Sequence, residues 1–202
     1  MKRIVFATGN RDKLKEIREI AAKFGMEVVS MKDAGYDMEI EENGTTFAEN
    51  ALLKARAICL ASGEITMADD SGLVVDAMDG MPGVQSARFM GHDTSYRIKN
   101  ARIIENLKDV PDEKRTARYV CAIVTVFPDG RILTAEETFE GKIAYEERGE
   151  NGFGYDPIFY VPEAGKTAAE MTPEEKHAIS HRGKALRAME AQLAKLAEAG
   201  EF

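Results

Sequence analysis

The sequence predicts a mixed α/β fold, and three observations support this class. Near the N-terminus, a short apolar run of the buried-strand type is followed by helical periodicity. Residues 117–141 form two strand-like segments around the turn Pro128-Asp129-Gly130. Two capping boxes, beginning at Thr46 and Thr172, each start a helix. Helices that follow strands, together with a long hairpin, are typical of a mixed sheet.

Composition limits the class of protein. The chain has 202 residues, 44% hydrophobic and 31% charged, which suits one domain spanning residues 1–202. A formal net charge of -8 argues against binding to nucleic acid. The cysteines, Cys59 and Cys121, lie in apolar patterns and are expected to be buried thiols in a reducing compartment. With no signal peptide and no apolar run of membrane-spanning length, we expect a soluble cytoplasmic protein without membrane contact.

The first elements are a strand at Ile4–Ala7 and a helix from Lys13 to Phe24, stopped by Gly25. Between them Asn10 is the expected N-cap. Strand-to-helix turns present free backbone N–H groups and favour anions. Lys13 at a helix start suits a phosphate, although an ordinary capped turn would also account for this segment.

A second strand is expected at Glu27–Met31, followed by an acidic loop, Glu39–Gly44. The capping box at Thr46 then starts a helix with a small-residue stripe. Asn50 and Lys54 lie one turn apart on a face beside that stripe.

The segment Thr66–Val75 contains two adjacent carboxylates, Asp69 and Asp70, within apolar sequence. Such a pair is costly to bury unless it is hydrogen-bonded, ion-paired or bound to metal. The alternative is a polar turn between two strands, which Gly72 would permit.

Further along, Thr94 or Ser95 should cap a helix that runs to about Leu107. The loop Glu150–Pro157 has Phe153 between two glycines, which suits either stacking on a base or burial in the core. A last strand is expected at Ile158–Val161. In the C-terminal helical region, His181-Arg182 lies at an interruption marked by Gly183.

The polar groups suggest chemistry on a metal-bound nucleotide. The carboxylates Glu41, Glu42, Asp69 and Asp70 are hard oxygen ligands, which suit Mg²⁺ or Mn²⁺. Lysines and an arginine beside glycines and hydroxyls suit a polyphosphate; they are Lys13, Lys54, Lys176 and Arg182. Phosphoryl transfer uses all of these groups.

Six motifs in order resemble the inosine/xanthosine triphosphate pyrophosphatase family, also called Ham1-like. They are Thr8-Gly9-Asn10 with Lys13; Thr46-Phe47 with Glu49-Asn50-Ala51 and Lys54-Ala55; Ala68-Asp69-Asp70-Ser71-Gly72-Leu73; Pro82-Gly83 with Ser86-Ala87-Arg88; Gly152-Phe153-Gly154-Tyr155-Asp156-Pro157; and Ser180-His181-Arg182.

The resemblance implies a long curved central sheet with flanking helices and two lobes around a substrate cleft. It implies a Mg²⁺-dependent homodimer that cleaves nucleoside triphosphates between the α- and β-phosphates, giving monophosphate and pyrophosphate. The implied substrates are ITP, dITP and XTP, and the implied role is removal of deaminated purines from the nucleotide pool.

The resemblance also implies roles for residues. Asp70 would be the general base and a metal ligand with Glu41, and Ser71 would contact substrate. Lys54 and Lys176 would offset triphosphate charge, Lys54 within the catalytic centre. Phosphates would lie on the turn formed by Thr8, Gly9, Asn10, Arg11, Asp12 and Lys13. The base would lie on the loop Phe153, Gly154, Tyr155 and Asp156, with His181 and Arg182 reading its edge.

Several alternatives stay open. Asp69 could replace Asp70 as the base, and Glu42 could replace Glu41 as the ligand. Fixed donors such as Arg182 would accept a 6-keto purine and reject adenine, by about 10⁴-fold in sites of this kind. Rejection of guanine must depend on its 2-position. A pyrophosphatase for modified pyrimidine nucleotides and a non-catalytic nucleotide-binding module are the competing functions.

Overall fold

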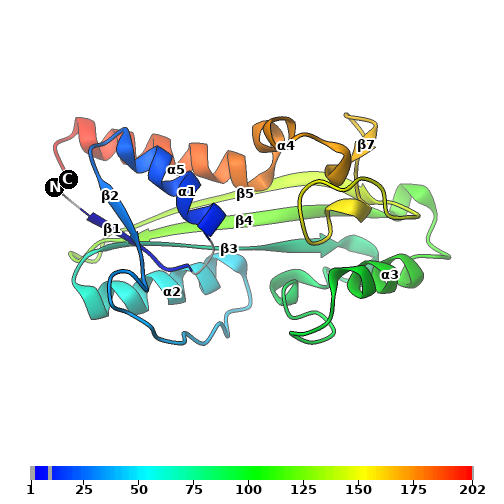
Figure 1. Ribbon diagram of the computed structural model, residues 1–202, viewed down its shortest axis with the longest axis horizontal. Coiled ribbons are helices and arrows are strands. Elements are labelled where there is room, and N and C mark those ends of the chain that lie inside the picture. Colours follow the sequence, from blue (N-terminus) through cyan, green and yellow to red (C-terminus); the bar gives the residue numbers. More distant parts are fainter. Residues whose placement is uncertain (1–2, 9–10, 202) are drawn as a thin grey trace. The chain divides into compact units, whose positions relative to one another are not determined.

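The computed structural model describes residues 3–8 and 11–201, apart from the side chains of Arg11, Asp12 and Glu16. Within this part, seven strands form one sheet in the order β2-β1-β3-β4-β5-β6-β7 (Figure 1). The strands are β1 (Arg3–Phe6), β2 (Glu27–Ser30), β3 (Ile65–Val75), β4 (Thr116–Val126), β5 (Ile132–Ile143), β6 (Phe159–Val161) and β7 (Lys166–Thr167). The α-helices are α1 (Arg11–Ala22), α2 (Phe47–Ser62), α3 (Tyr96–Asn106), α4 (Pro173–Ile179) and α5 (His181–Glu198).

The sheet is mixed, as predicted. Strand β1 pairs in parallel with β2 and β3, whereas β6 pairs antiparallel with β5 and β7. Strands β4 and β5 are neighbours joined by a tight turn, in which Phe127 N donates to Arg131 O at 2.9 Å. The mixed α/β class with a central sheet is confirmed.

The chain divides into two compact units. The first comprises Met1–Asp70, Cys121–Glu137 and Ala185–Phe202, and the second comprises Ser71–Val120 and Thr138–Lys184. Neither unit is a continuous stretch of sequence, because β3, β4 and β5 each contribute residues to both. That residues 1–202 act as one functional domain stays a prediction.

The first unit has helices on both faces of its part of the sheet (Figure 1). Successive strand residues point to opposite faces. Ile4 and Phe6 therefore pack in a core with α1 and α5, while Val5 and Ala7 pack in a second core with α2. All four side chains are 6% exposed or less, so both faces of β1 are buried.

Helix α2 begins at the predicted capping box. The Thr46 hydroxyl accepts from Glu49 N at 3.1 Å, and the Glu49 carboxylate accepts from Thr46 N at 3.2 Å. The helix ends at Gly63, whose φ of 67° is the left-handed conformation that glycine adopts without strain. These local signals fix both ends of the helix that carries Asn50 and Lys54.

The second unit has its own apolar core. Leu73 and Val75 of β3 pack with Ile103 and Leu107 of α3, and with buried residues of β4, β5 and β6. Arg115 is fully buried and donates to three backbone carbonyls, those of Leu107, Ile143 and Ala144. A buried guanidinium is tolerated when its donors are satisfied in this way.

One sequence interpretation is wrong. Asp69 to Gly72 do not form a polar turn, because they lie inside β3, which continues unbroken from Ile65 to Val75. An ion pair compensates the buried Asp69 carboxylate, so the strand tolerates it.

Other element boundaries differ from those that the sequence predicted. Helix α1 spans Arg11–Ala22 rather than Lys13–Phe24, because its first turn carries polar residues that apolar periodicity does not reveal. The short strand β7 follows β6, so Ile158–Val161 is not the last strand. Gly183 does not mark the C-terminal interruption: the break is at Ser180, whose extended backbone separates α4 from α5 and whose hydroxyl accepts from Gly183 N at 3.1 Å.

Candidate functional site

The predicted phosphate turn is described only in part. Gly9 and Asn10 lie outside the described residues, as do the side chains of Arg11 and Asp12, so the predictions for these four are untested. Thr8 follows β1 and donates its backbone N–H to Phe6 O at 2.8 Å. Lys13 is the third residue of α1.

Lys13 forms an ion pair with the first of the paired carboxylates. Its Nζ lies 2.7 Å from Oδ2 of Asp69, whose side chain is 1% exposed, against 25% for that of Lys13. The lysine thus supplies the counter-charge that a buried aspartate requires. The ammonium keeps some access to solvent, so it can also meet an anion.

Asp70 has a different environment from its neighbour. Its side chain is 16% exposed, and its Oδ2 accepts from Asn50 Nδ2 at 3.2 Å. The ammonium of Lys54 lies 3.9 Å from its Oδ1 and 3.1 Å from Oε2 of Glu42. A partly exposed carboxylate can reach a water molecule, which the buried carboxylate of Asp69 cannot do as readily.

Asn50 connects the acidic loop to Asp70. It is fully buried, and its Oδ1 accepts from Gly44 N at 2.8 Å while its Nδ2 donates to Asp70. A Cβ on Gly44 would lie 2.7 Å from Asn50 Oδ1, so only glycine allows this close approach. The acidic loop is therefore fixed beside the helix that carries Lys54.

The donors around Asp70 fit a hard divalent cation. They are carboxylate oxygens, and the Lys54 ammonium already lies between Glu42 and Asp70, so the environment accepts positive charge. Among the described residues, no group of three or more His, Cys, Asp or Glu side chains could hold a metal. The Glu41 side chain is exposed on the same loop.

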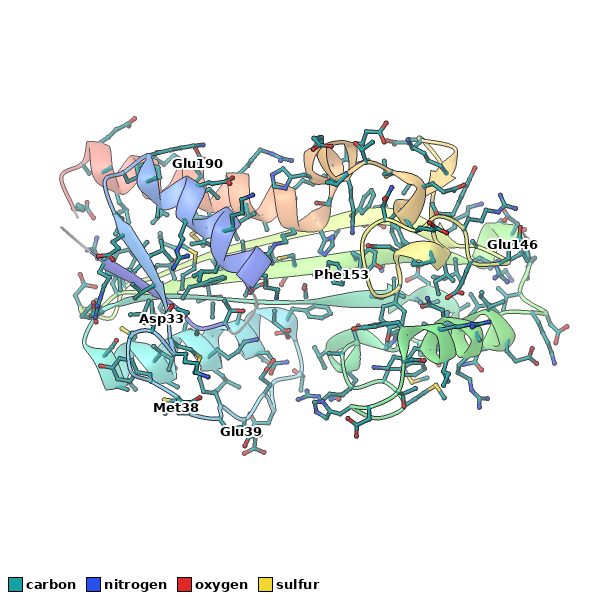
Figure 2. The ribbon with its side chains drawn as sticks, in the orientation of Figure 1. Asp33, Met38, Glu39, Glu146, Phe153 and Glu190 are labelled. Atoms are coloured by element: carbon teal, nitrogen blue, oxygen red, sulfur yellow. The ribbon has the colours of Figure 1, made fainter. Side chains whose placement is uncertain are left out.

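The second unit contains the other predicted cluster, centred on Asp156. Its side chain is 2% exposed, and it accepts from Phe153 N at 2.9 Å and from Lys176 Nζ at 2.6 Å. Phe153, labelled in Figure 2, is 76% exposed, and the Lys176 ammonium lies 5.3 Å from its ring centroid. An exposed aromatic ring on a loop held by two such bonds is a preformed surface for stacking.

The loop before Asp156 requires glycine. Gly152 has a φ of +73°, and a Cβ there would lie 2.1 Å from Oδ2 of Asp156. The Gly154 carbonyl accepts from Nδ2 of the buried Asn100 at 3.3 Å. Tyr155 is buried and donates its hydroxyl to Ser86 O at 2.7 Å. Both sides of Phe153 are thus attached to the body of this unit.

His181 and Arg182 form the first turn of α5, and both are partly buried. The His181 ring stacks on Tyr119, with centroids 4.8 Å apart and planes at 12°. The Tyr119 hydroxyl donates to Oδ1 of Asp156 at 3.2 Å. Tyr119 therefore contacts two of the residues predicted to read the base.

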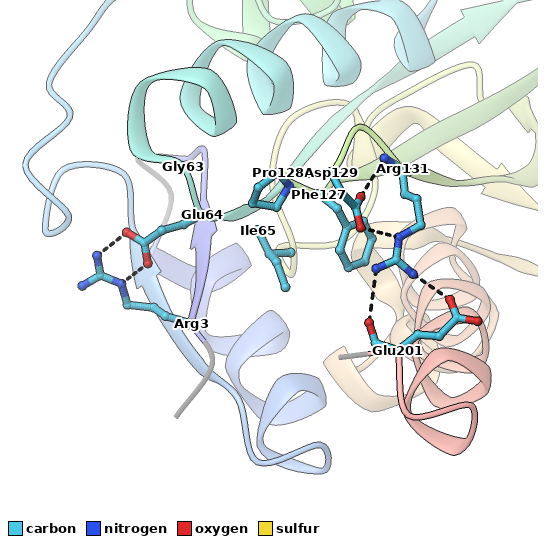
Figure 3. A pocket seen from close by; sticks show the side chains of 9 residues that line it. All are labelled: Arg3, Gly63, Glu64, Ile65, Phe127, Pro128, Asp129, Arg131 and Glu201. Carbon is cyan, nitrogen blue, oxygen red and sulfur yellow. Dashed lines mark hydrogen bonds and ion pairs between the residues drawn. The ribbon is translucent and has the colours of Figure 1, made fainter.

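A pocket of about 360 Å³ lies elsewhere in the first unit (Figure 3). Its lining is Arg3, Gly63, Glu64, Ile65, Phe127, Pro128, Asp129, Arg131 and Glu201. None of these is a predicted site residue. The charged groups pair with one another, Arg3 with Glu64 and Arg131 with both Asp129 and Glu201.

Sequence reasoning gave no functional role to two residues of these clusters, Asn50 and Tyr119. Asn50 had a signal, since it precedes Lys54 by one helical turn, but its bond to Asp70 depends on the fold. Tyr119 had none, because an aromatic residue in a strand is ordinarily part of the core.

The buried thiols Cys59 and Cys121 are confirmed. No helix in the described part of the chain is long and apolar enough to cross a membrane.

Comparison with known proteins identifies relatives of similar length. A dITP/XTP pyrophosphatase of Exiguobacterium sibiricum is 48% identical over 95% of this chain and 96% of its own. One of Desulforamulus reducens is 50% identical over 92% of each chain. The solved Ham1 protein of Staphylococcus aureus superposes with a TM-score of 0.91 at 39% identity, over 96% of this chain and 99% of its own.

The family assignment follows from the extent of the match. The sequence model of the Ham1 family matches residues 4–192. This range includes the Lys13–Asp69 pair, the surroundings of Asp70 and the loop that carries Phe153. The chain belongs to the Ham1 family.

Proposed function

We propose that this chain is a nucleoside triphosphate pyrophosphatase that converts ITP, dITP and XTP to the monophosphate and pyrophosphate. The observation that carries the proposal is the environment of Asp70, a partly exposed carboxylate oriented by Asn50 and set near the Lys54 ammonium. The names of relatives about half identical to this chain support the substrate class.

In the proposed reaction, Asp70 accepts a proton from the attacking water. Asn50 holds one carboxylate oxygen, and the other lies 3.9 Å from the Lys54 ammonium. Lys54 and Lys13 bring positive charge to the polyphosphate, and water cleaves the bond between the α- and β-phosphates. The exposed ring of Phe153 stacks on the base, with His181 and Arg182 directed to its edge.

Mg²⁺ is the cofactor that suits these donors. When bound by Asp70 and a carboxylate of the acidic loop, it would neutralise phosphate charge. The resemblance points to Glu41 for the second carboxylate, whereas Glu42 is the one that contacts Lys54. The homodimer and the cytoplasmic location stay predictions.

The test is a phosphate-release assay with ITP, XTP, ATP, GTP and dTTP, with and without Mg²⁺. Signal from ITP and XTP that requires added inorganic pyrophosphatase supports cleavage to pyrophosphate. Phosphate released without that coupling enzyme would mean γ-phosphate cleavage and would overturn the proposal. An Asp70→Asn preparation controls for contaminating phosphatases.

The same assay addresses the competing functions. Turnover of pyrimidine nucleotides instead of ITP would indicate a pyrophosphatase of another specificity. No signal from any nucleotide would favour a non-catalytic nucleotide-binding module.

A further inference from the structure

The loop that carries Phe153 meets one buried side chain of α3 at both of its ends. Asn100 is 1% exposed, and its Nδ2 donates to Oε1 of Glu147 at 2.8 Å and to the Gly154 carbonyl at 3.3 Å. A side-chain amide nitrogen has two N–H groups, so each end of the loop takes one. Because Glu147 precedes Phe153 and Gly154 follows it, we call residues 147–154 the Phe153 loop.

A second residue of α3 lies against the same end of the loop. Tyr96 precedes Asn100 by one helical turn, and its ring packs edge-on against that of Tyr155, with centroids 5.2 Å apart. A Cβ on Gly154 would lie 3.5 Å from the Tyr96 ring, so the loop backbone runs next to the helix. Helix α3 is therefore the surface against which this end of the Phe153 loop is held.

The middle of the Phe153 loop is attached on its other side. Asn151 donates from its backbone N to Ala169 O at 2.9 Å and from Nδ2 to Met171 O at 3.0 Å. These two bonds join the loop to the segment before α4, and neither reaches α3. Residues 150–153 are exposed, so burial of their side chains does little to hold the loop in place.

The other polar atom of the Asn100 side chain shows what the residue costs. Its Oδ1 is buried and has no hydrogen-bond partner within the described part of the chain. A buried acceptor without a partner costs at least as much free energy as a typical hydrogen bond contributes. The two bonds that Asn100 donates are thus offset in part, and we expect the residue to affect the loop more than the stability of the unit.

We propose that Asn100 is a positioning residue that holds the Phe153 loop against α3 in the conformation that binds nucleotide. It acts through the loop and does not touch the substrate, because it is buried. The inference rests on the proposed function, since it requires the base to stack on Phe153.

The test replaces Asn100 by leucine, whose side chain has the same branching without polar atoms. In Asn100→Leu, KM for ITP should rise about tenfold, which corresponds to the net contribution of one or two hydrogen bonds, and kcat should change little. A purely structural role would reduce the folded fraction, which lowers the apparent kcat and leaves KM unchanged. Melting curves measure the stability of each variant.

Two neighbouring glutamates provide the comparison and the control. Glu147→Ala should raise KM on its own but should add nothing to the effect of Asn100→Leu, because the two residues share one bond. Glu146→Ala removes an exposed carboxylate that pairs with Arg148 and should leave KM unchanged. Additive effects of Glu147→Ala and Asn100→Leu, or a rise in KM in Glu146→Ala equal to that in Glu147→Ala, would overturn the proposal.

Hydrogen exchange measured by mass spectrometry gives a readout that does not depend on turnover. Amide exchange across residues 150–156 should be faster in Asn100→Leu than in the unmodified protein, and Glu146→Ala should match the unmodified protein. Unchanged exchange, or an unchanged KM, in Asn100→Leu would overturn the role of Asn100. Absence of ITP turnover by the unmodified protein would instead contradict the proposed function, and the exchange rates would still decide whether Asn100 holds the loop.

Discussion

The ammonium of Lys54 lies 3.1 Å from the carboxylate of Glu42, while the side chain of the preceding residue, Glu41, is exposed. Two adjacent carboxylates on one loop therefore differ in environment. Glu42 is engaged with a cation of its own chain, and Glu41 is available to another.

This difference predicts separate effects of two substitutions. Glu41→Gln should raise the Mg²⁺ concentration needed for half-maximal activity by at least about tenfold, because losing a proposed ligand should cost no less than losing a residue that only supports a ligand. Glu42→Gln should lower kcat with little change in that concentration, because it releases Lys54. Activity titrations with Mg²⁺ measure both. A higher Mg²⁺ requirement in Glu42→Gln alone would assign the ligand to Glu42.

The paired aspartates should separate catalysis from stability. Asp70→Asn should abolish turnover of ITP and leave the melting temperature nearly unchanged, because the amide still accepts from Asn50. Asp69→Asn should lower the free energy of unfolding by up to about 3 kcal/mol, because it leaves Lys13 without its buried partner. Urea unfolding and initial rates on the two variants form the comparison. Near-normal turnover by Asp70→Asn would remove it as the base.

The base loop should be intolerant of a side chain at Gly152. Alanine there meets Asp156 Oδ2 at 2.1 Å, so we expect the loop to shift and KM for ITP to rise at least tenfold. Gly165→Ala is the matched control, since its φ is +67° but a Cβ there meets nothing within 4 Å. Gly165→Ala should lose about 1 to 2 kcal/mol of stability through backbone strain. Its KM for ITP should not change. A similar KM for both variants would contradict the account of the loop.

Protonation of Asp76 at low pH should lower the stability of the second unit. Its bond from the Thr116 hydroxyl and its ion pair with Arg118 lower the pKa of Asp76 below the ordinary value of 3.8. Because the pKa of Asp76 is lower in the folded state, its ionised carboxylate stabilises the fold at pH values above 3.8. This stabilisation is lost as the pH falls through the folded-state pKa. Asp76→Asn should therefore be less stable than the unmodified protein at pH 7, with the difference shrinking below about pH 4. A difference that stays constant between pH 7 and pH 3, in urea unfolding, would count against this assignment.

The parts of the structure that the sequence predicted are those with local signals. The capping box at Thr46 depends on residues within one turn, and it forms as expected. The strand at Ile4 carries its own apolar run. The end of α1 was placed incorrectly because apolar periodicity does not mark where helical hydrogen bonds stop.

The contacts of the candidate site could not be predicted in the same way. Tyr119 and Asp156 are 37 positions apart, and nothing in either local sequence indicates that they meet. Asp69 and Asp70 look alike in the sequence, yet alternation along β3 buries one and leaves the other partly exposed. Family resemblance supplied the residue types, and the fold supplied their different surroundings.

The exposed ring of Phe153 has a practical consequence. The chain contains no tryptophan, so Phe153→Trp would introduce a single indole on a loop whose two sides are fixed by Asp156 and Asn100. A purine that stacked on the indole would change its fluorescence, whether or not the nucleotide was hydrolysed. The loop therefore provides a position from which nucleotide occupancy can be followed optically, in real time and apart from turnover.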